Sequence, residues 1–100
     1  MERKETKKDM PTIAEFKRRM IAGSKWIFTA NYLKEPIERT CTVSQSNSFA
    51  LTGLRNPKES SWCDWPSKNS SQINFIDGKM IIRINFGPNE EFLQYEEKED

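Results

Sequence analysis

The pair Asp77-Gly78 constrains the fold more than any other feature, because it lies between two apolar runs in QINFIDGKMIIRINF (residues 72–86). Asp-Gly is a preferred pair for a two-residue type I′ turn, in which both central residues need a positive φ. With this pair as the loop, alternation puts six apolar side chains on one face of a hairpin. The six are Ile73, Phe75, Met80, Ile82, Ile84 and Phe86. An isolated hairpin is marginal in water, so the rest of the chain must cover that face.

Signals elsewhere predict one helix and five further strands. The capping box that begins at Thr12 opens a helix over residues 12–22. Its apolar stripe comprises Ile13, Phe16, Met20 and Ile21. Aromatic and β-branched residues between turn signals predict strands over 26–31, 39–44, 49–52, 61–65 and 91–95. Cys41 and Val43 are expected on one face of the second of these. The predicted fold class is α+β, with one N-terminal helix packed on a twisted antiparallel sheet or a small open β-barrel.

The chain of 100 residues has no internal repeat and is expected to form a single domain. Residues 1–10 are charged and lack periodicity, which predicts a flexible basic N-terminus. Residues 11–96 form the expected α+β domain, and residues 97–100 an expected flexible acidic tail. Glu96 and Glu97 are assigned to this loose end, where a carboxylate lacks the positioning that catalysis needs.

The composition argues against catalysis and against a metal site. The chain has no histidine, which removes the usual general base near neutral pH and the commonest metal ligand. Its two cysteines, Cys41 and Cys63, are expected to be free thiols, and two ligands cannot complete a structural zinc site. Neither of the glycine-rich nucleotide-binding motifs occurs. We therefore expect a protein that is not an enzyme and that needs no cofactor or metal.

Charge and hydropathy bear on the location of the protein. The formal net charge is +1, so bulk charge alone implies neither a nucleic-acid nor a membrane partner. No apolar run is long enough to span a bilayer, and the chain does not start with a charged-then-apolar leader. The expectation is a cytoplasmic protein.

Two polar and aromatic segments are the candidate recognition residues. A turn rich in hydroxyl and amide groups precedes the third predicted strand, and a tryptophan pair flanks an aspartate in the fourth. The residues concerned are Ser46, Asn47, Ser48, Trp62, Asp64 and Trp65. The simplest alternative gives the first three a turn role and the tryptophans a core role. Because the tryptophans are three apart, they should face opposite ways on a strand. Trp62 is expected to be the buried one, since Pro66 puts Trp65 at the strand end.

A basic surface is the second candidate. It comprises Lys17, Arg18, Arg19 and Lys25. The simplest interpretation is a solvated helix face, and the functional one is contact with phosphates or with an acidic partner.

Three segments carry a family resemblance. They are TIAEFKRRMIAGSKW (residues 12–26), SQSNSFAL (residues 44–51) and SWCDWP (residues 61–66). Together they resemble small uncharacterised proteins of bacteriophages and prophages, over about residues 11–76. The link between the first two strands, Leu33 to Glu38, is shorter here than in many of those proteins. The resemblance implies a compact accessory protein of a mobile element, and it does not imply any active-site residues.

The leading hypothesis is a non-enzymatic phage or prophage accessory protein that binds a host protein in the bacterial cytoplasm, in order to antagonise a defence. One alternative is a nucleic-acid-binding protein that uses the basic helix and an exposed tryptophan. Another is a protein that binds a small ligand such as a nucleotide between the Ser46–Ser48 turn and the tryptophan segment. The chain is expected to be a monomer or a homodimer, since an open sheet edge favours pairing.

Overall fold

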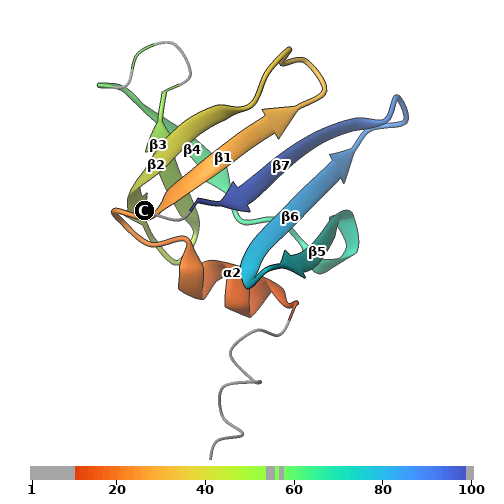
Figure 1. Ribbon diagram of the computed structural model, residues 1–100, viewed down its shortest axis with the longest axis horizontal. Helices are drawn as coiled ribbons and strands as arrows, with labels where there is room; N and C mark the ends of the chain where they lie inside the picture. The colour runs from red at the N-terminus through yellow and green to blue at the C-terminus, as the bar shows by residue number, and fades with distance from the viewer. Residues whose placement is uncertain (1–10, 54–55, 57, 99–100) are drawn as a thin grey trace, which may run out of the picture.

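The computed structural model describes residues 11–53, 56 and 58–98 (Figure 1). Within them the chain forms one α-helix, one 3-10 helix and seven strands. In order these are α2 (Ile13–Arg19), β1 (Lys25–Ala30), β2 (Ile37–Ser44), β3 (Ser48–Thr52), β4 (Ser60–Asp64), η1 (Lys68–Ser70), β5 (Ser71–Ile76), β6 (Lys79–Phe86) and β7 (Glu91–Glu97). The predicted flexible N-terminus, residues 1–10, lies outside the described residues.

The seven strands form one open antiparallel sheet with the order β4-β3-β2-β1-β7-β6-β5. Two meanders, β1 to β4 and β5 to β7, join where β7 returns to pair with β1. The described chain is mostly β, with α2 lying near the lower end of β6 in the view of Figure 1. This agrees with the predicted α+β class at the level of one short helix and an antiparallel sheet.

The predicted hairpin forms in the predicted register. Phe75 pairs with Met80 across β5 and β6, and the turn residues Asp77 and Gly78 have φ values of 54° and 81°. Met80 is fully buried, as expected for the apolar face of the hairpin. Phe86 is the exception with 43% of its surface exposed, because it is the last residue of β6.

β2 changes partners halfway along its length. Its first residues, Ile37 to Thr40, pair with β1, and its later residues pair with β3. The register shifts between Cys41 and Val43, where a bulge inserts an extra residue. Cys41 pairs with Leu51 on the core side, whereas Val43 pairs with Ala50, the residue before Leu51. The prediction that Cys41 and Val43 share a face is therefore wrong.

An aromatic cluster around Phe16 occupies the core. Its ring centroid lies 5.6 Å from that of Trp26, 6.0 Å from Phe49, 5.7 Å from Trp65 and 6.2 Å from Tyr95. These partners come from β1, β3, β7 and the segment after β4. One helical side chain therefore contacts distant parts of the sheet.

The helix is shorter than predicted. Thr12 caps it as expected, its Oγ1 accepting from the backbone N–H of Glu15 over 3.1 Å. The helix ends at Arg19 rather than at residue 22, because Met20 already has a non-helical ψ of 78°. Met20 is buried, but Ile21 is 53% exposed and does not belong to the apolar stripe.

The acidic end of the described chain is also more ordered than predicted. β7 runs to Glu97 and lies between β1 and β6, so Glu96 and Glu97 belong to the sheet. Glu97 Oε1 accepts from the Met80 backbone N–H over 2.7 Å and from Arg19 Nη1 over 2.7 Å. The predicted flexible tail therefore does not begin at residue 97.

Candidate functional site

Three residues from neighbouring strands form a row on the outer face of the sheet. Val43 on β2 pairs with Ala50 on β3, and Ala50 pairs with Trp62 on β4. Cross-strand partners point to the same face of a sheet. That face is the outer one, because the alternate β4 residues Ser60, Trp62 and Asp64 are exposed, although Ala50 itself is fully buried. Trp62 stands out from it with 56% of its surface exposed.

Hydroxyl groups and one carboxylate border this row. Thr42 Oγ1 donates to the Ala50 carbonyl over 3.3 Å and lies 3.3 Å from Ser60 Oγ. Ser48 pairs with Asp64 at the other end of β3 and β4, on the same face as Trp62. We call this surface the Trp62 face, made of Thr42, Val43, Ser48, Ser60, Trp62 and Asp64. Ala50, the cross-strand partner of Trp62, has no exposed surface.

Trp62 differs from the other two tryptophans in its indole N–H. Trp26 Nε1 donates to Ser24 Oγ over 2.9 Å, and Trp65 Nε1 donates to the Gln45 carbonyl over 2.8 Å. No described residue accepts a hydrogen bond from Trp62. The exposed ring of Trp62 therefore offers a partner both an apolar surface and a free donor.

Trp65 is a structural residue. It is half-buried, and its ring centroid lies 4.5 Å from that of Phe49. Lys17 Nζ lies 5.6 Å from the ring centroid of Trp65. The prediction that Trp62 is buried and Trp65 exposed is wrong. The physical reason is that the pairing with β3 turns Trp62 to the outer face, whereas Trp65, one residue past the end of β4, packs against the core.

The predicted Ser46–Ser48 turn does lie beside the tryptophan segment. The Gln45 N–H donates to the Ser48 carbonyl over 2.8 Å, which closes the turn, and Ser46 and Asn47 are exposed. The Trp65 hydrogen bond to Gln45 joins this turn to the end of β4. Sequence reasoning found these neighbours, but it missed Val43 and Ala50 because the bulge in β2 has no clear sequence signal.

The predicted basic surface is largely engaged in ion pairs. Arg18 and Arg19 both bind the carboxylate of Glu15, which is 7% exposed, and Arg19 also binds Glu97. The Arg19 side chain is 14% exposed and stacks over Phe75 at 5.0 Å, so the prediction that it faces water is wrong. The hydrogen bond from Arg18, followed by that from Arg19, lowers the pKa of Glu15 despite its burial. Arg18 and the exposed Lys25 make further interactions.

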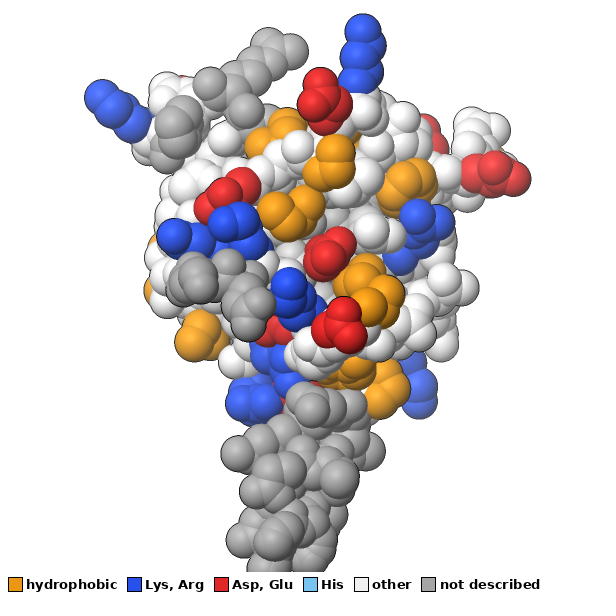
Figure 2. All heavy atoms as spheres, in the orientation of Figure 1, with side chains coloured by type: hydrophobic (Ala, Val, Ile, Leu, Met, Phe, Trp, Pro, Cys, Tyr) orange, Lys and Arg blue, Asp and Glu red, His pale blue; other side chains and the backbone are white. Residues whose placement is uncertain are grey.

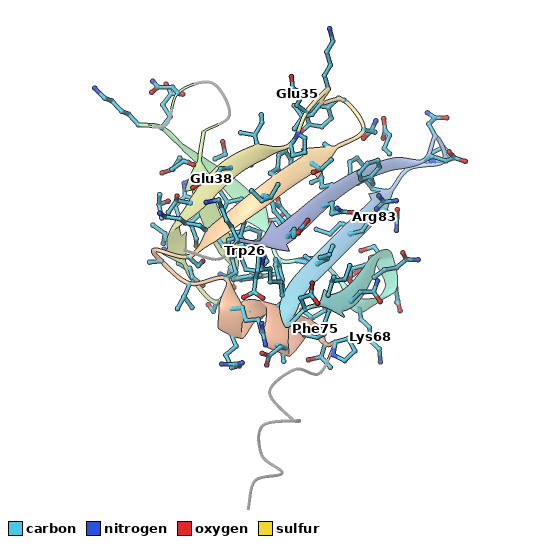
Figure 3. The ribbon with its side chains drawn as sticks, in the orientation of Figure 1. Trp26, Glu35, Glu38, Lys68, Phe75 and Arg83 are labelled. Atoms are coloured by element: carbon cyan, nitrogen blue, oxygen red, sulfur yellow. The ribbon has the colours of Figure 1, made fainter. Side chains whose placement is uncertain are left out.

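The face that Figure 2 presents, over β1, β7 and β6, mixes hydrophobic and charged side chains. A row of cross-strand partners runs across this face, from β2 to β6 in the order Glu38, Ile27, Glu96 and Ile81. Figure 3 shows Glu38 on β2 and Arg83 on β6, on either side of β1 and β7. Arg83 lies 4.2 Å from the Phe92 ring centroid and donates to Gln94. Charged groups interrupt the apolar surface here.

Two thiols and two hollows lie elsewhere among the described residues. Cys63 Sγ lies 3.7 Å from the Tyr95 hydroxyl, and burial raises the pKa of the Cys41 thiol and of Tyr95. Cys41 and Tyr95 therefore stay protonated near neutral pH. A hollow of about 360 Å³ lies between the start of α2 and β5, and one of about 230 Å³ lies at the β5–β6 turn. Neither is lined by the Ser46–Ser48 turn or by a tryptophan.

Arg39 is a buried residue that the sequence did not single out. It is 4% exposed, its Nε donates to the Thr52 carbonyl over 2.7 Å, and its guanidinium lies 5.0 Å from the Phe28 ring centroid. Its Nη2 is buried without a hydrogen-bond partner among the described residues. Burying a charged group without a partner costs free energy. Substitutions of Arg39 therefore test whether its guanidinium stabilises β2 against the end of β3.

Comparisons with protein-family models, with curated proteins and with solved structures found no match. No helix among the described residues is long and apolar enough to cross a membrane. Within residues 11–53, 56 and 58–98, no group of three or more Cys, Asp or Glu side chains lies close enough to hold a metal ion.

Proposed function

We propose that this chain is a small non-enzymatic protein-binding domain that recognises its partner with the Trp62 face. The observation that carries the proposal is the exposed Trp62 indole, whose N–H has no acceptor among the described residues and which lies on the same face as the half-buried Val43. Tryptophan is enriched among the residues that dominate binding energy at protein interfaces. The bordering hydroxyls and Asp64 supply the polar rim that such interfaces have.

The proposal includes the predicted packing of the helix on a small open barrel. Phe16 supports it, because this helical ring contacts aromatic residues from β1, β3 and β7. A cluster fixed in this way holds the inner side of β3 in place. The neighbouring strand β4 then presents the exposed Trp62 on a rigid support, which lowers the entropic cost of binding.

We further propose that the partner is a host protein in the bacterial cytoplasm, and that the chain is a phage or prophage accessory protein acting against a defence. The support is the resemblance to such proteins in residues 44–51 and 61–66. These segments contain the β2–β3 turn, nearly all of β3 and most of β4, which together supply half of the Trp62 face.

Comparative affinity purification from a bacterial lysate tests this proposal. The baits are the wild type, Trp62→Ala and the control Ile76→Ala, which removes an equally exposed apolar side chain (58%) from β5. We expect one host protein to be enriched by the wild type and by Ile76→Ala, and to fall at least about tenfold with Trp62→Ala. Equal recovery by all three baits would exclude the Trp62 face as the binding surface.

A nucleic-acid partner is the competing function that the exposed indole also favours, since bases stack on such rings. It has less support from charge, because Glu15 already engages Arg18 and Arg19. Binding through phosphates falls steeply with salt. A labelled single strand that binds the wild type with a steep salt dependence, and fails to bind Trp62→Ala, would favour this function over a protein partner.

A further inference from the structure

β4 is an edge of the sheet. Among the described strands only β3 pairs with it, in an unbroken register from Ser48 and Asp64 to Thr52 and Ser60. An edge strand presents unpaired backbone groups along its free side, and proteins usually protect such edges with lysine, proline or a bulge. The β4 residues Ser-Ser-Trp-Cys-Asp include neither lysine nor proline, and the pairing with β3 has no bulge. Among the described residues the free side of β4 has no strand beside it, so it can accept one.

The residues of β4 complement a second copy of the same strand. In an antiparallel pair centred on Trp62, Ser60 lies opposite Asp64 of the other copy, and Ser61 lies opposite Cys63. This register is the one that pairs all five residues and keeps outer side chains opposite outer ones. Asp64, which carries the one charge of the strand, then meets a hydroxyl that can donate to it rather than another carboxylate.

We propose that a second copy of this chain adds antiparallel to β4, which forms a symmetric homodimer with a continuous sheet. Pairing along a strand edge leaves both sheet faces uncovered. The two Trp62 side chains then lie directly opposite each other at the two-fold axis, about 5 Å apart at Cβ. The inference builds on the proposed function, because it joins two Trp62 faces into one recognition surface. The protein partner then contacts two indoles rather than one.

A designed crosslink tests the register. Ser61→Cys puts a thiol opposite the native Cys63 of the other copy, whereas the control Ser60→Cys puts one opposite Asp64. Mild oxidation should convert most of Ser61→Cys to a covalent dimer on a non-reducing gel, with little from Ser60→Cys or the wild type. Equal crosslinking by both variants, or none by either, would overturn the register.

Sedimentation of the wild type, without partner, tests the dimer itself. We expect a species of twice the chain mass across micromolar concentrations, lost in Trp62→Lys because two like charges meet at the axis. Ile76→Lys on the opposite edge, β5, is the control and should stay dimeric. A monomeric wild type, or a dimer lost only in Ile76→Lys, would overturn the proposal. A monomeric wild type whose partner recovery still depends on Trp62 would leave the proposed function standing.

Discussion

The indole N–H of Trp65 donates a hydrogen bond to the Gln45 carbonyl over 2.8 Å, which connects the residue after β4 to the turn before β3. The same ring packs against Phe49, so Trp65 contributes to the stability of the domain. Trp62, three residues earlier, has neither kind of contact to the core. The two tryptophans therefore divide structure and recognition between them.

Alanine substitutions should separate these two roles. Trp65→Ala should lower the free energy of unfolding by about 2–4 kcal/mol, because it removes a half-buried ring and a hydrogen bond. Trp62→Ala should change it by less than about 0.5 kcal/mol, as is usual at exposed sites. Urea denaturation followed by circular dichroism measures both. Similar losses in the two variants would assign Trp62 to the core.

Arg39 predicts an unusual pair of stability effects. Arg39→Met also leaves the Thr52 carbonyl without its donor, but it keeps the volume and removes a buried charge that has no ion pair among the described residues, so the free energy of unfolding should stay within about 1 kcal/mol of the wild type. Arg39→Ala leaves a cavity and an unpaired Thr52 carbonyl, and should cost about 2–4 kcal/mol. Denaturant titrations of the two variants give the comparison. If Arg39→Met lowers the free energy of unfolding as much as Arg39→Ala does, the guanidinium itself stabilises the fold at this position.

The Glu15 network predicts a pH dependence of stability. The bonds from Arg18 and Arg19 depress the pKa of Glu15 below its ordinary value of 4.5 in the folded chain. Folding is then stabilised fully above that value, and the stabilisation is lost as pH falls through the lower folded pKa. Melting temperatures should therefore drop more steeply below about pH 4.5 in the wild type than in Glu15→Gln. Parallel curves of melting temperature against pH for the two proteins would show that the ionisation of Glu15 does not contribute to this loss of stability.

The β5–β6 turn predicts a strain effect at Gly78. Its φ of 81° is unfavourable for side chains, most of all β-branched ones, although nothing lies within 4 Å of a Cβ placed there. Gly78→Val should thus destabilise by about 1–3 kcal/mol through backbone strain alone. Gly78→Asn, which tolerates positive φ, is the matched control and should cost less. Equal costs measured by thermal unfolding would point to a contact rather than to strain.

The local part of the fold was predictable from the sequence. The Asp77-Gly78 turn determines its own register, and Thr12 caps the helix, because both depend on residues only a few positions apart. Long-range placements were not predictable. Glu97, the last residue of β7, lies between β1 and β6 and meets Arg19, 78 positions away in the sequence. No composition or periodicity encodes that pairing.

The sequence predicted the local part of the candidate site but not the faces to which its side chains point, because those depend on long-range pairing. The Ser46–Ser48 turn and the Trp62–Trp65 segment are neighbours as expected, since consecutive strands with a short turn usually pair. The assignment of the exposed tryptophan failed because it relied on Pro66 to place Trp65 at an exposed strand end. The pairing of Trp62 with Ala50 instead turns Trp62 outward, and Trp65, just past the end of β4 at Asp64, packs on the core. Val43 reached the outer face only through the bulge in β2.

Iodide quenching of intrinsic fluorescence tests the central claim, that Trp62 is the exposed anchor of the recognition surface. The proteins to compare are the wild type and Trp62→Phe, each free and with the partner identified by affinity purification. Trp26, which is fully buried, is the shielded reference, and the half-buried Trp65 contributes the same quenching to both proteins. The account predicts stronger quenching of the free wild type than of Trp62→Phe, and a loss of this difference in the complex. Equal quenching of the two free proteins, or a difference that the partner leaves unchanged, would contradict it.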